Sequence, residues 1–593
     1  MDHQSIYQLF QEVTTVNGSK LAFQYKKGGN WFDVTWTEAR ESVTRVSKAL
    51  IAMGLAKGDR VCILSGTRLE WSLCDYGIVG CGAVTVGIYH SSLASDCAYI
   101  VNHSDAELIF LEDQDQLDKI LEVRADLPKL RQIVIFDGSS DPANKVLGWE
   151  DFLDKGADIS DEQAAQRGDE IGPDDMASIV YTSGTTGVPK GAMITNSNLL
   201  FTSQSVIDCL DLMPHYKTLM FLPLAHVFAR LIAYTCLRYP APMAFAEDFT
   251  TVPQNLKEIR PQFMASVPRL YEKAYEKILV GVEEAGGIKK VLFNWAVGVG
   301  RKVSARQLSH QPVTGVLAMQ HKLAHKLVLH KIGDALGGQL EWAISGAAPL
   351  NQAIGEFFHA CGVNILEGIG MTENTSFSHV NRLDHNKFGS VGQPGPGVEA
   401  RIAEDGEVLI RGGNVMQGYF KNEEATAETI DDDGWLLTGD IGEIDDEGFL
   451  RITDRKKDLI VTAGGKNVAP QRIEQIMRTS QYIGQVVAIG DRRKYISALV
   501  TLDPDAISQW AVEKGMETED LEALAADPKV RELIEAEVAE RNKQLASYES
   551  IKRFHILPRD FTIEGGELTP TLKVKRKVVT EKHQAEIAAL YPD

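Results

Sequence analysis

The residue types best suited to chemistry stand in one run, Tyr181-Thr-Ser-Gly-Thr-Thr-Gly-Val-Pro-Lys-Gly191, directly after the apolar segment 177–180. Its glycines let the backbone approach an anion closely, its hydroxyls and N–H groups can surround phosphate oxygens, and Lys190 can neutralise charge. The GxxxxGK[ST] spacing is missing, which disfavours an ordinary P-loop nucleotide triphosphatase. The alternative is a glycine-rich turn between a strand and a helix. We predict a polyphosphate site made by Thr182, Ser183, Gly184, Thr185, Thr186, Gly187 and Lys190.

Six more motifs follow along the chain. They are Ser345-Gly-Ala-Ala-Pro349, Leu366-Glu-Gly-Ile-Gly-Met-Thr-Glu373, Thr438-Gly-Asp440, Asp454-Arg-Lys-Lys-Asp-Leu459, Gly464-Gly-Lys-Asn467 and Leu568-Thr-Pro-Thr-Leu-Lys-Val-Lys-Arg576. With the glycine-rich run, they resemble the ordered signatures of the adenylate-forming superfamily, which contains acyl-CoA synthetases, luciferases and peptide-synthetase adenylation domains. Each motif alone is a weak pattern, but the ordered set covers nearly the whole chain and is specific.

This resemblance implies an ATP site. Thr182 and Glu373 would hold Mg²⁺, a hard cation that prefers oxygen ligands and takes the remainder from phosphates. Asp440 would accept both ribose hydroxyls, with Arg455 as a second contact. Otherwise Glu373 is a solvated carboxylate, Asp440 a turn residue and Arg455 part of an exposed charge run. The remaining nucleotide contacts would come from Gly346, Ala347, Glu367, Gly368, Ile369, Gly370, Met371 and Thr372. At Ile369 the family usually has a tyrosine that stacks on adenine, so this chain offers no aromatic stack there.

A lysine near the C-terminus has the clearest chemical task. In adenylation, a carboxylate attacks the α-phosphorus of ATP and pyrophosphate leaves, so negative charge builds on both sides and a positioned cation stabilises the transition state. Lys573 aligns with the family's catalytic lysine by its spacing to Arg576, and Lys575 and Lys577 are rivals. With Lys190 and Glu373, it forms the predicted catalytic set, to which His226 is added below.

A second half-reaction needs the site to be remade. The resemblance implies that Lys457 is a hinge for the C-terminal domain. It also implies that the loop containing Gly464, Gly465 and Lys466 lies beside the pantetheine of coenzyme A once the domain has turned.

Three stretches resemble the long-chain fatty acyl-CoA branch: Phe221–Phe228, Val267–Lys273 and Leu292–Ala296. Within the first, His226 is expected near the substrate carboxylate or the acyl entrance, although a histidine after Pro-Leu-Ala could equally be a core residue. Trp295 could gate an acyl tunnel, but packing is the favoured interpretation. Ala229 replaces the glutamate that is common in this branch.

The sequence predicts an α/β fold. Short β-branched runs alternate with helical segments through the first three quarters, which favours a mostly parallel sheet. After Gly406, Asp-Gly and Glu-Gly turns separate short strands, which is typical of a small antiparallel unit. We expect a large N-terminal domain (1–453) with two doubly wound α/β subdomains, a small β-barrel subdomain and a helical insertion at about 270–336. A linker (454–459) and a small mobile α+β C-terminal domain (460–593) would follow.

Composition narrows the partners and the compartment. The net charge of −21 disfavours binding to nucleic acid or anionic surfaces in general. Seven dispersed cysteines, without a CxxC pair, suggest reduced cytosolic thiols. No signal-peptide pattern or long apolar run occurs, so we expect a cytoplasmic protein that touches membranes at most transiently. The sequence leaves a homodimer open.

The sequence therefore predicts a ligase that joins a long-chain fatty acid to coenzyme A through an acyl-adenylate, with ATP and Mg²⁺. The first alternative is a fatty acyl-AMP ligase that loads a carrier protein. That branch carries an insertion obstructing domain rotation, and none is seen between Ile452 and Val468. A luciferase-like oxidase shares the adenylation step, but nothing indicates oxygen chemistry. The last alternative is an inactive lipid-binding protein of the same fold.

Overall fold

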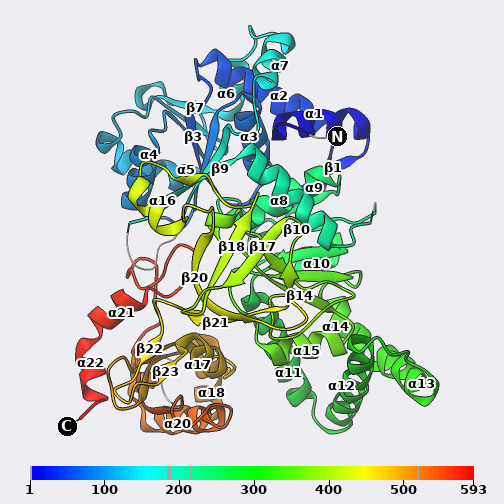
Figure 1. The fold of residues 1–593 in the computed structure, drawn as a ribbon, viewed down its shortest axis with the longest axis vertical. Helices are drawn as coiled ribbons and strands as arrows, with labels where there is room; N and C mark the ends of the chain where they lie inside the picture. The colour runs from blue at the N-terminus through cyan, green and yellow to red at the C-terminus, as the bar shows by residue number, and fades with distance from the viewer. Residues whose placement is uncertain (1–2, 183–187, 214, 517–519, 593) are drawn as a thin grey trace.

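A computed structural model describes residues 3–182, 188–213, 215–516 and 520–592. Its largest sheet has eight strands in the order β19-β9-β8-β4-β3-β5-β6-β7 (Figure 1). Their bounds are Gly418–Tyr419, Gly191–Thr195, Met176–Tyr181, Val84–Ile88, Arg60–Leu64, Leu108–Leu111, Gln132–Ile135 and Val146–Gly148. The strands from β8 to β7 are parallel, whereas β9 and β19 are antiparallel additions at one edge. The alternating strands and helices of the sequence thus form the expected α/β sheet.

Two smaller mixed sheets make up the second expected α/β subdomain. One has the order β10-β11-β1-β2, and the other β12-β13-β14-β15-β16. Their bounds are β1 Leu21–Lys27, β2 Asn30–Thr35, β10 Thr218–Met220, β11 Met243–Phe245, β12 Phe263–Ser266, β13 Trp342–Ser345, β14 Asn364–Ile369, β15 His379–Val380 and β16 Gln393–Pro394. The backbone N–H of Gln262 donates to the carbonyl of Lys217 at 3.1 Å, which joins the two sheets edge to edge.

The unit expected to be a β-barrel is a four-stranded antiparallel sheet, β17-β18-β20-β21. Its strands span Val398–Ile402, Glu407–Gly412, Leu436–Ile444 and Leu450–Arg455. Strand β21 continues into the predicted linker, because the ladder pairs Ile441 with Asp454 and Asp440 with Arg455. The irregular connection therefore begins only at Lys456.

The C-terminal region has hydrophobic clusters of its own around a three-stranded sheet. Strands β24 (Ile483–Ile489) and β25 (Ile496–Leu502) form an antiparallel pair, and β26 (Ile551–Ile556) pairs with β25 in parallel. The helical stretch between β25 and β26 is interrupted, with α19 (Leu521–Ala526) ending just before α20 (Pro528–Asn542). Pro528 explains the break, since proline lacks the N–H that would continue α19 and is favoured in the first turn of a new helix.

The segment predicted as a helical insertion projects from one side of the molecule (Figure 1). It contains α11 (Pro268–Ala285), α12 (Gly287–Leu308), α13 (Gly315–Ala324), a π-helical turn (His325–Leu329) and α14 (His330–Ala335). Helix α11 packs on α12 and on α15 (Gln352–Ala360). Within the described ranges, no helix is long and apolar enough to cross a membrane.

A buried ion pair joins the main sheet to the helix that follows His226. Arg230 of α9 (Val227–Arg238) donates to Asp75 of α3 (Leu69–Gly80) at 2.7 Å, and both side chains are almost fully buried. Arg230 also donates to the hydroxyl of Ser178 on β8, and the Tyr234 hydroxyl donates to Asp75 at 2.7 Å. Because every partner is itself hydrogen-bonded, the charges are compensated where water is excluded.

Replacing Arg230 with Ala should lower the unfolding free energy of the N-terminal region by about 3–5 kcal/mol, because Asp75 would remain buried without its cation. Urea titration followed by tryptophan fluorescence measures the loss. Arg45→Ala is the control: Arg45 pairs with Glu150 at the surface, so it should cost less than about 1 kcal/mol. Equal effects of the two substitutions would contradict this account.

Candidate active site

A cleft of about 3030 Å³ lies between the N-terminal sheets and the C-terminal region. Most of the described residues that the sequence analysis selected line this cleft: Thr182, Lys190, His226, Ala347, Glu367, Gly368, Ile369, Gly370, Met371, Thr372, Glu373, Asp440, Arg455, Lys457 and Lys573. Gly346 lines an adjoining apolar cavity. Gly464, Gly465 and Lys466 lie outside the lining of the cleft. Ser183, Gly184, Thr185, Thr186 and Gly187 fall outside the described residues.

The two ends of the glycine-rich run are fixed by the ladder between β8 and β9. Tyr181 pairs with Gly191, and the ladder continues where the N–H of Thr182 donates to the Lys190 carbonyl at 2.9 Å. The Lys190 N–H in turn approaches Thr182 Oγ1 at 3.4 Å. Two antiparallel strands thus bring a hydroxyl and an ammonium to the two sides of the same loop.

Lys190 and Glu373 are connected through Tyr419, which sequence reasoning missed. The Lys190 ammonium lies 4.7 Å from the centre of the Tyr419 ring, and the Tyr419 hydroxyl donates to Glu373 Oε1 at 2.6 Å. Burial, followed by the Glu373 charge, raises the pKa of Tyr419, so the phenol stays protonated as a donor. Tyr419 reaches the site because β19 pairs with β9, a contact that no local pattern in the sequence indicates.

Oxygen donors at this position suit Mg²⁺. The Tyr419 hydroxyl donates to one carboxylate oxygen of Glu373. The other oxygen of Glu373, Oε2, accepts no hydrogen bond from the described residues. Thr182 adds a hydroxyl on the wall of the same cleft. The described part of the chain contains no group of three or more His, Cys, Asp or Glu residues that would hold a metal alone. One carboxylate and one hydroxyl fit a cation that takes most of its ligands from phosphates and water.

The loop after β14 is constrained by close packing. A Cβ at Gly370 would lie 2.0 Å from the backbone of Ser376, so only glycine fits there. Ile369 packs against a small apolar cluster that includes Val391 and Leu450. Glu367 accepts a hydrogen bond from the Leu350 N–H at 2.9 Å, and burial raises its pKa to about 7. This wall of the cleft is therefore closely packed.

Asp440 and Arg455 face each other across β20 and β21. The Arg455 Nε donates to Asp440 Oδ1 at 3.0 Å, as expected for directly paired residues on an antiparallel ladder. The Asp440 side chain is buried, and this burial raises its pKa even though Arg455 favours the charged form. The pair presents an acceptor and a donor side by side, a combination suited to neighbouring hydroxyl groups.

Lys573 enters the cleft from the C-terminal region. The Thr569 hydroxyl accepts from the Lys573 N–H at 3.0 Å, and the Ser91 hydroxyl donates to the Pro570 carbonyl at 3.2 Å, which ties this loop to the N-terminal sheets. Burial is the main cause that lowers the pKa of the Lys573 ammonium, and the positive charge of Arg455 is the second. The negative charges of Asp440 and Glu373 oppose this shift. These partners place its charge at the predicted nucleotide site.

The two rival lysines lie differently. Lys577 also lines the cleft, but it is 3.9 Å from Glu581 on its own helix. Lys575 does not line the cleft. The arrangement therefore favours Lys573 over both neighbours as the cation of this site.

His226 caps the start of α9. Its Nδ1 accepts from the Phe228 N–H at 3.1 Å, which leaves Nε2 as the protonated nitrogen of the neutral ring. Burial, followed by the charge of Lys573, lowers its pKa to about 3. His226 is therefore a neutral hydrogen-bond donor around pH 7.

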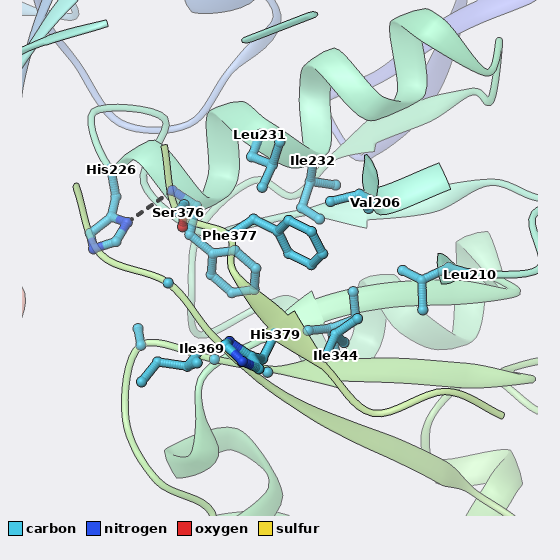
Figure 2. A pocket seen from close by; sticks show the side chains of 16 residues that line it. Val206, Leu210, His226, Leu231, Ile232, Ile344, Ile369, Ser376, Phe377 and His379 are labelled. Atoms are coloured by element: carbon cyan, nitrogen blue, oxygen red, sulfur yellow. Dashed lines mark hydrogen bonds between the residues drawn. The ribbon is translucent and has the colours of Figure 1, made fainter. Parts of the chain in front are cut away.

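Next to His226 lies a narrow apolar cavity of about 40 Å³ (Figure 2). Figure 2 shows the imidazole at one side and Val206 and Leu210 at the other, with Phe377 between them. Trp295 lines neither this cavity nor the cleft, and instead packs partly buried against the main core. This position matches the packing interpretation of Trp295.

The predicted hinge and the predicted coenzyme A loop lie at the start of the C-terminal region. Lys457 is exposed in the turn between β21 and β22 (Ile460–Val461). The glycines at 464 and 465 and Lys466 form the exposed turn between β22 and β23 (Asn467–Val468). In this arrangement Lys573 faces the cleft and the glycine turn does not.

The fold and the site define a class of protein. The chain belongs to the AMP-binding enzyme family, whose model matches residues 10–420, and the model of the AMP-binding enzyme C-terminal domain matches residues 457–593.

Among its relatives, the chain is 37% identical over 595 residues to the long-chain-fatty-acid–CoA ligase FadD15 of Mycobacterium tuberculosis, covering 100% of this chain and 97% of that protein. It is 32% identical to the human long-chain-fatty-acid–CoA ligase ACSBG1, covering 99% and 85%. Among solved structures, its fold is similar to the anthranilate CoA ligase AuaEII with anthranoyl-AMP (TM-score 0.73, 20% identity, 99% of both chains). It is also similar to a carboxylate reductase adenylation domain from Mycobacterium chelonae (TM-score 0.78, 20% identity, 100% and 92%).

Replacing Asp440 with Asn should weaken AMP binding about 10- to 100-fold, because hydrogen bonds to a charged group contribute about 1.5–3 kcal/mol and the amide keeps only one acceptor oxygen. Isothermal titration calorimetry measures the affinity. Asp446→Asn, in the exposed turn between β20 and β21, removes the same charge and should leave the affinity unchanged. Unaltered binding by the Asp440 variant would show that the nucleotide sits elsewhere.

Proposed function

We propose that this protein is a long-chain fatty-acid–CoA ligase. It would use ATP to convert a fatty acid to acyl-AMP and pyrophosphate, and then transfer the acyl group to coenzyme A with release of AMP. The observation that carries the proposal is the convergence of Glu373, the Asp440–Arg455 pair and Lys573 on one cleft. Full-length similarity to relatives named long-chain-fatty-acid–CoA ligases supports the choice of acid and thiol.

In the first half-reaction, the side chains would act on developing charge. Lys573 and Lys190 would stabilise negative charge as the carboxylate attacks the α-phosphorus and pyrophosphate leaves. Asp440 and Arg455 would hold the ribose. Thr182 and Glu373 would hold Mg²⁺, which when bound neutralises phosphate charge. His226, as a neutral donor, would orient the carboxylate without competing for the phosphates as a cation.

The acyl chain would enter the apolar cavity beside His226. Its volume of about 40 Å³ is room for only a few water-sized groups. A long chain therefore requires lining side chains such as Phe377 to move when it binds.

The second half-reaction would require the C-terminal region to turn about Lys457. In the present arrangement Lys573 occupies the cleft while the turn at Gly464, Gly465 and Lys466 lies outside it. Rotation would withdraw Lys573 and bring this turn beside the pantetheine of coenzyme A. The enzyme would act in the cytoplasm, with small molecules as its substrates.

Purified protein incubated with ATP, Mg²⁺ and fatty acids of graded length, with and without coenzyme A, tests the proposal. We expect AMP and long-chain acyl thioester by mass spectrometry. Lys573→Ala should reduce adenylation about a hundredfold or more, whereas the neighbouring Lys575→Ala should not. Acyl-AMP that accumulates despite coenzyme A would indicate a carrier-protein ligase. No AMP with any acid would favour an inactive lipid-binding protein.

Replacing Lys457 with Pro should spare adenylation and cripple thioester formation, because proline fixes φ at the pivot. ATP–pyrophosphate exchange reports the first step, and acyl-CoA formed from added acyl-AMP reports the second. Lys457→Ala is the matched control, since it removes the charge but keeps the backbone free. Equal loss of both steps in the proline variant would count against a hinge at this residue.

A further inference from the structure

The helical hairpin of residues 287–333, hereafter the basic hairpin, differs in charge from the rest of the chain. It contains six lysines, two arginines and no Asp or Glu, although the whole chain has a net charge of −21. These cations are Lys289, Lys290, Arg301, Lys302, Arg306, Lys322, Lys326 and Lys331. Positive charge is thus concentrated on the part of the molecule that projects furthest to one side in Figure 1.

Most of this charge is not neutralised within the protein. Lys290 pairs with Glu283 at 2.6 Å, but the other seven cations form no ion pair with any part of the chain that the structure describes. All seven are exposed. An anionic partner could therefore approach them without first breaking an internal salt bridge.

The same hairpin exposes an apolar stripe. Val316, Met319, Leu323 and Leu327 are 70, 71, 50 and 40% exposed, at spacings of three and four residues along α13 and the π-helical turn. Such spacing places side chains on one face of a helix. Of the eighteen large apolar side chains exposed in the described residues, six lie in this hairpin, so the exposure is clustered rather than scattered.

We propose that the basic hairpin docks on an anionic lipid bilayer, with the apolar stripe inserted at the headgroup boundary and the surrounding cations facing lipid phosphates. A helix with an apolar face flanked by lysines has the properties of an interfacial anchor. Charge complementarity selects the anionic surface, because each Lys or Arg near such a surface adds to binding. The acidic remainder of the protein would be repelled, which leaves the hairpin as the contact.

Docking at this place would connect the bilayer to the cleft. Ile332 at the end of the hairpin, Leu336 just after it, and Ala274 and Ile278 of α11 line the cleft. A fatty acid that leaves the membrane would therefore meet apolar side chains on its way to the site. This step, unlike the docking itself, rests on the proposed ligase function.

Co-sedimentation of the full-length protein with lipid vesicles, without ATP or fatty acid, tests the docking. We expect binding to vesicles of phosphatidylcholine with 30% phosphatidylglycerol, but little binding to phosphatidylcholine alone, and weaker binding at 0.5 M NaCl. The double variants Met319→Glu/Leu323→Glu and Lys322→Glu/Lys326→Glu should each reduce partitioning about tenfold or more. Matched exposed controls are Val512→Glu and Lys514→Glu/Lys529→Glu, which should bind like the wild type.

Unchanged binding by both hairpin variants, or equal binding to neutral vesicles, would overturn the proposal. A second result would also overturn it: the wild type binds no vesicles, light scattering shows that it is a dimer, and the Met319→Glu/Leu323→Glu variant is a monomer. The stripe would then be covered by a second copy of the chain. Ligase assays separate the two proposals. The hairpin variants should keep activity on water-soluble octanoate and lose it on palmitate supplied in vesicles. Vesicle binding without any ligase activity would refute the proposed function and leave the docking intact.

Discussion

The pairing of β20 with β21 is the constraint on which the rest of the site depends. This ladder sets Asp440 against Arg455 and ends there, directly before Lys456, where the connection to the C-terminal region begins. The same few residues therefore fix the predicted ribose contact and the start of the connection to the region that carries Lys573. A shift of register by one residue would turn Asp440 to the other face of the sheet and change the direction in which the chain leaves it.

The α/β class was predictable because its signals are local. Runs such as Val61–Leu64 are apolar throughout, as parallel strands buried on both faces must be, and β3 (Arg60–Leu64) contains this run. The candidate site was selected from motifs, since the glycines that allow close backbone approach and the short runs around Glu373 and Asp440 resemble the ordered signatures of one family. Gly370 illustrates this: the clash that a side chain would make with Ser376 explains why glycine stands there.

What the sequence did not reveal depends on contacts between distant segments. Tyr419 is connected to Glu373 only because a two-residue strand joins the edge of the main sheet. Arg230 gave no signal, since its partner Asp75 is 155 residues away. The spacing to Arg576 selected Lys573 among the C-terminal lysines, but only the position of the C-terminal region shows that Lys573 lines the cleft whereas Lys575 does not. The antiparallel strands β15 and β16 of the second subdomain were not predicted, because such short strands carry too few residues to show a period.

The delivery of one cation by a separate region has a consequence for reversibility. The charge that assists loss of pyrophosphate must also assist its return, because forward and reverse reactions share one transition state. If the C-terminal region turns after the first step, Lys573 leaves the cleft. The reverse reaction, in which pyrophosphate attacks the acyl-adenylate, then lacks the cation that would stabilise its transition state. The mixed anhydride would then be shielded from pyrophosphate in solution while it waits for the thiol. Under the proposed hinge, rotation of the C-terminal region would slow the reverse of the first step without changing its equilibrium, and so would give the thiol time to react.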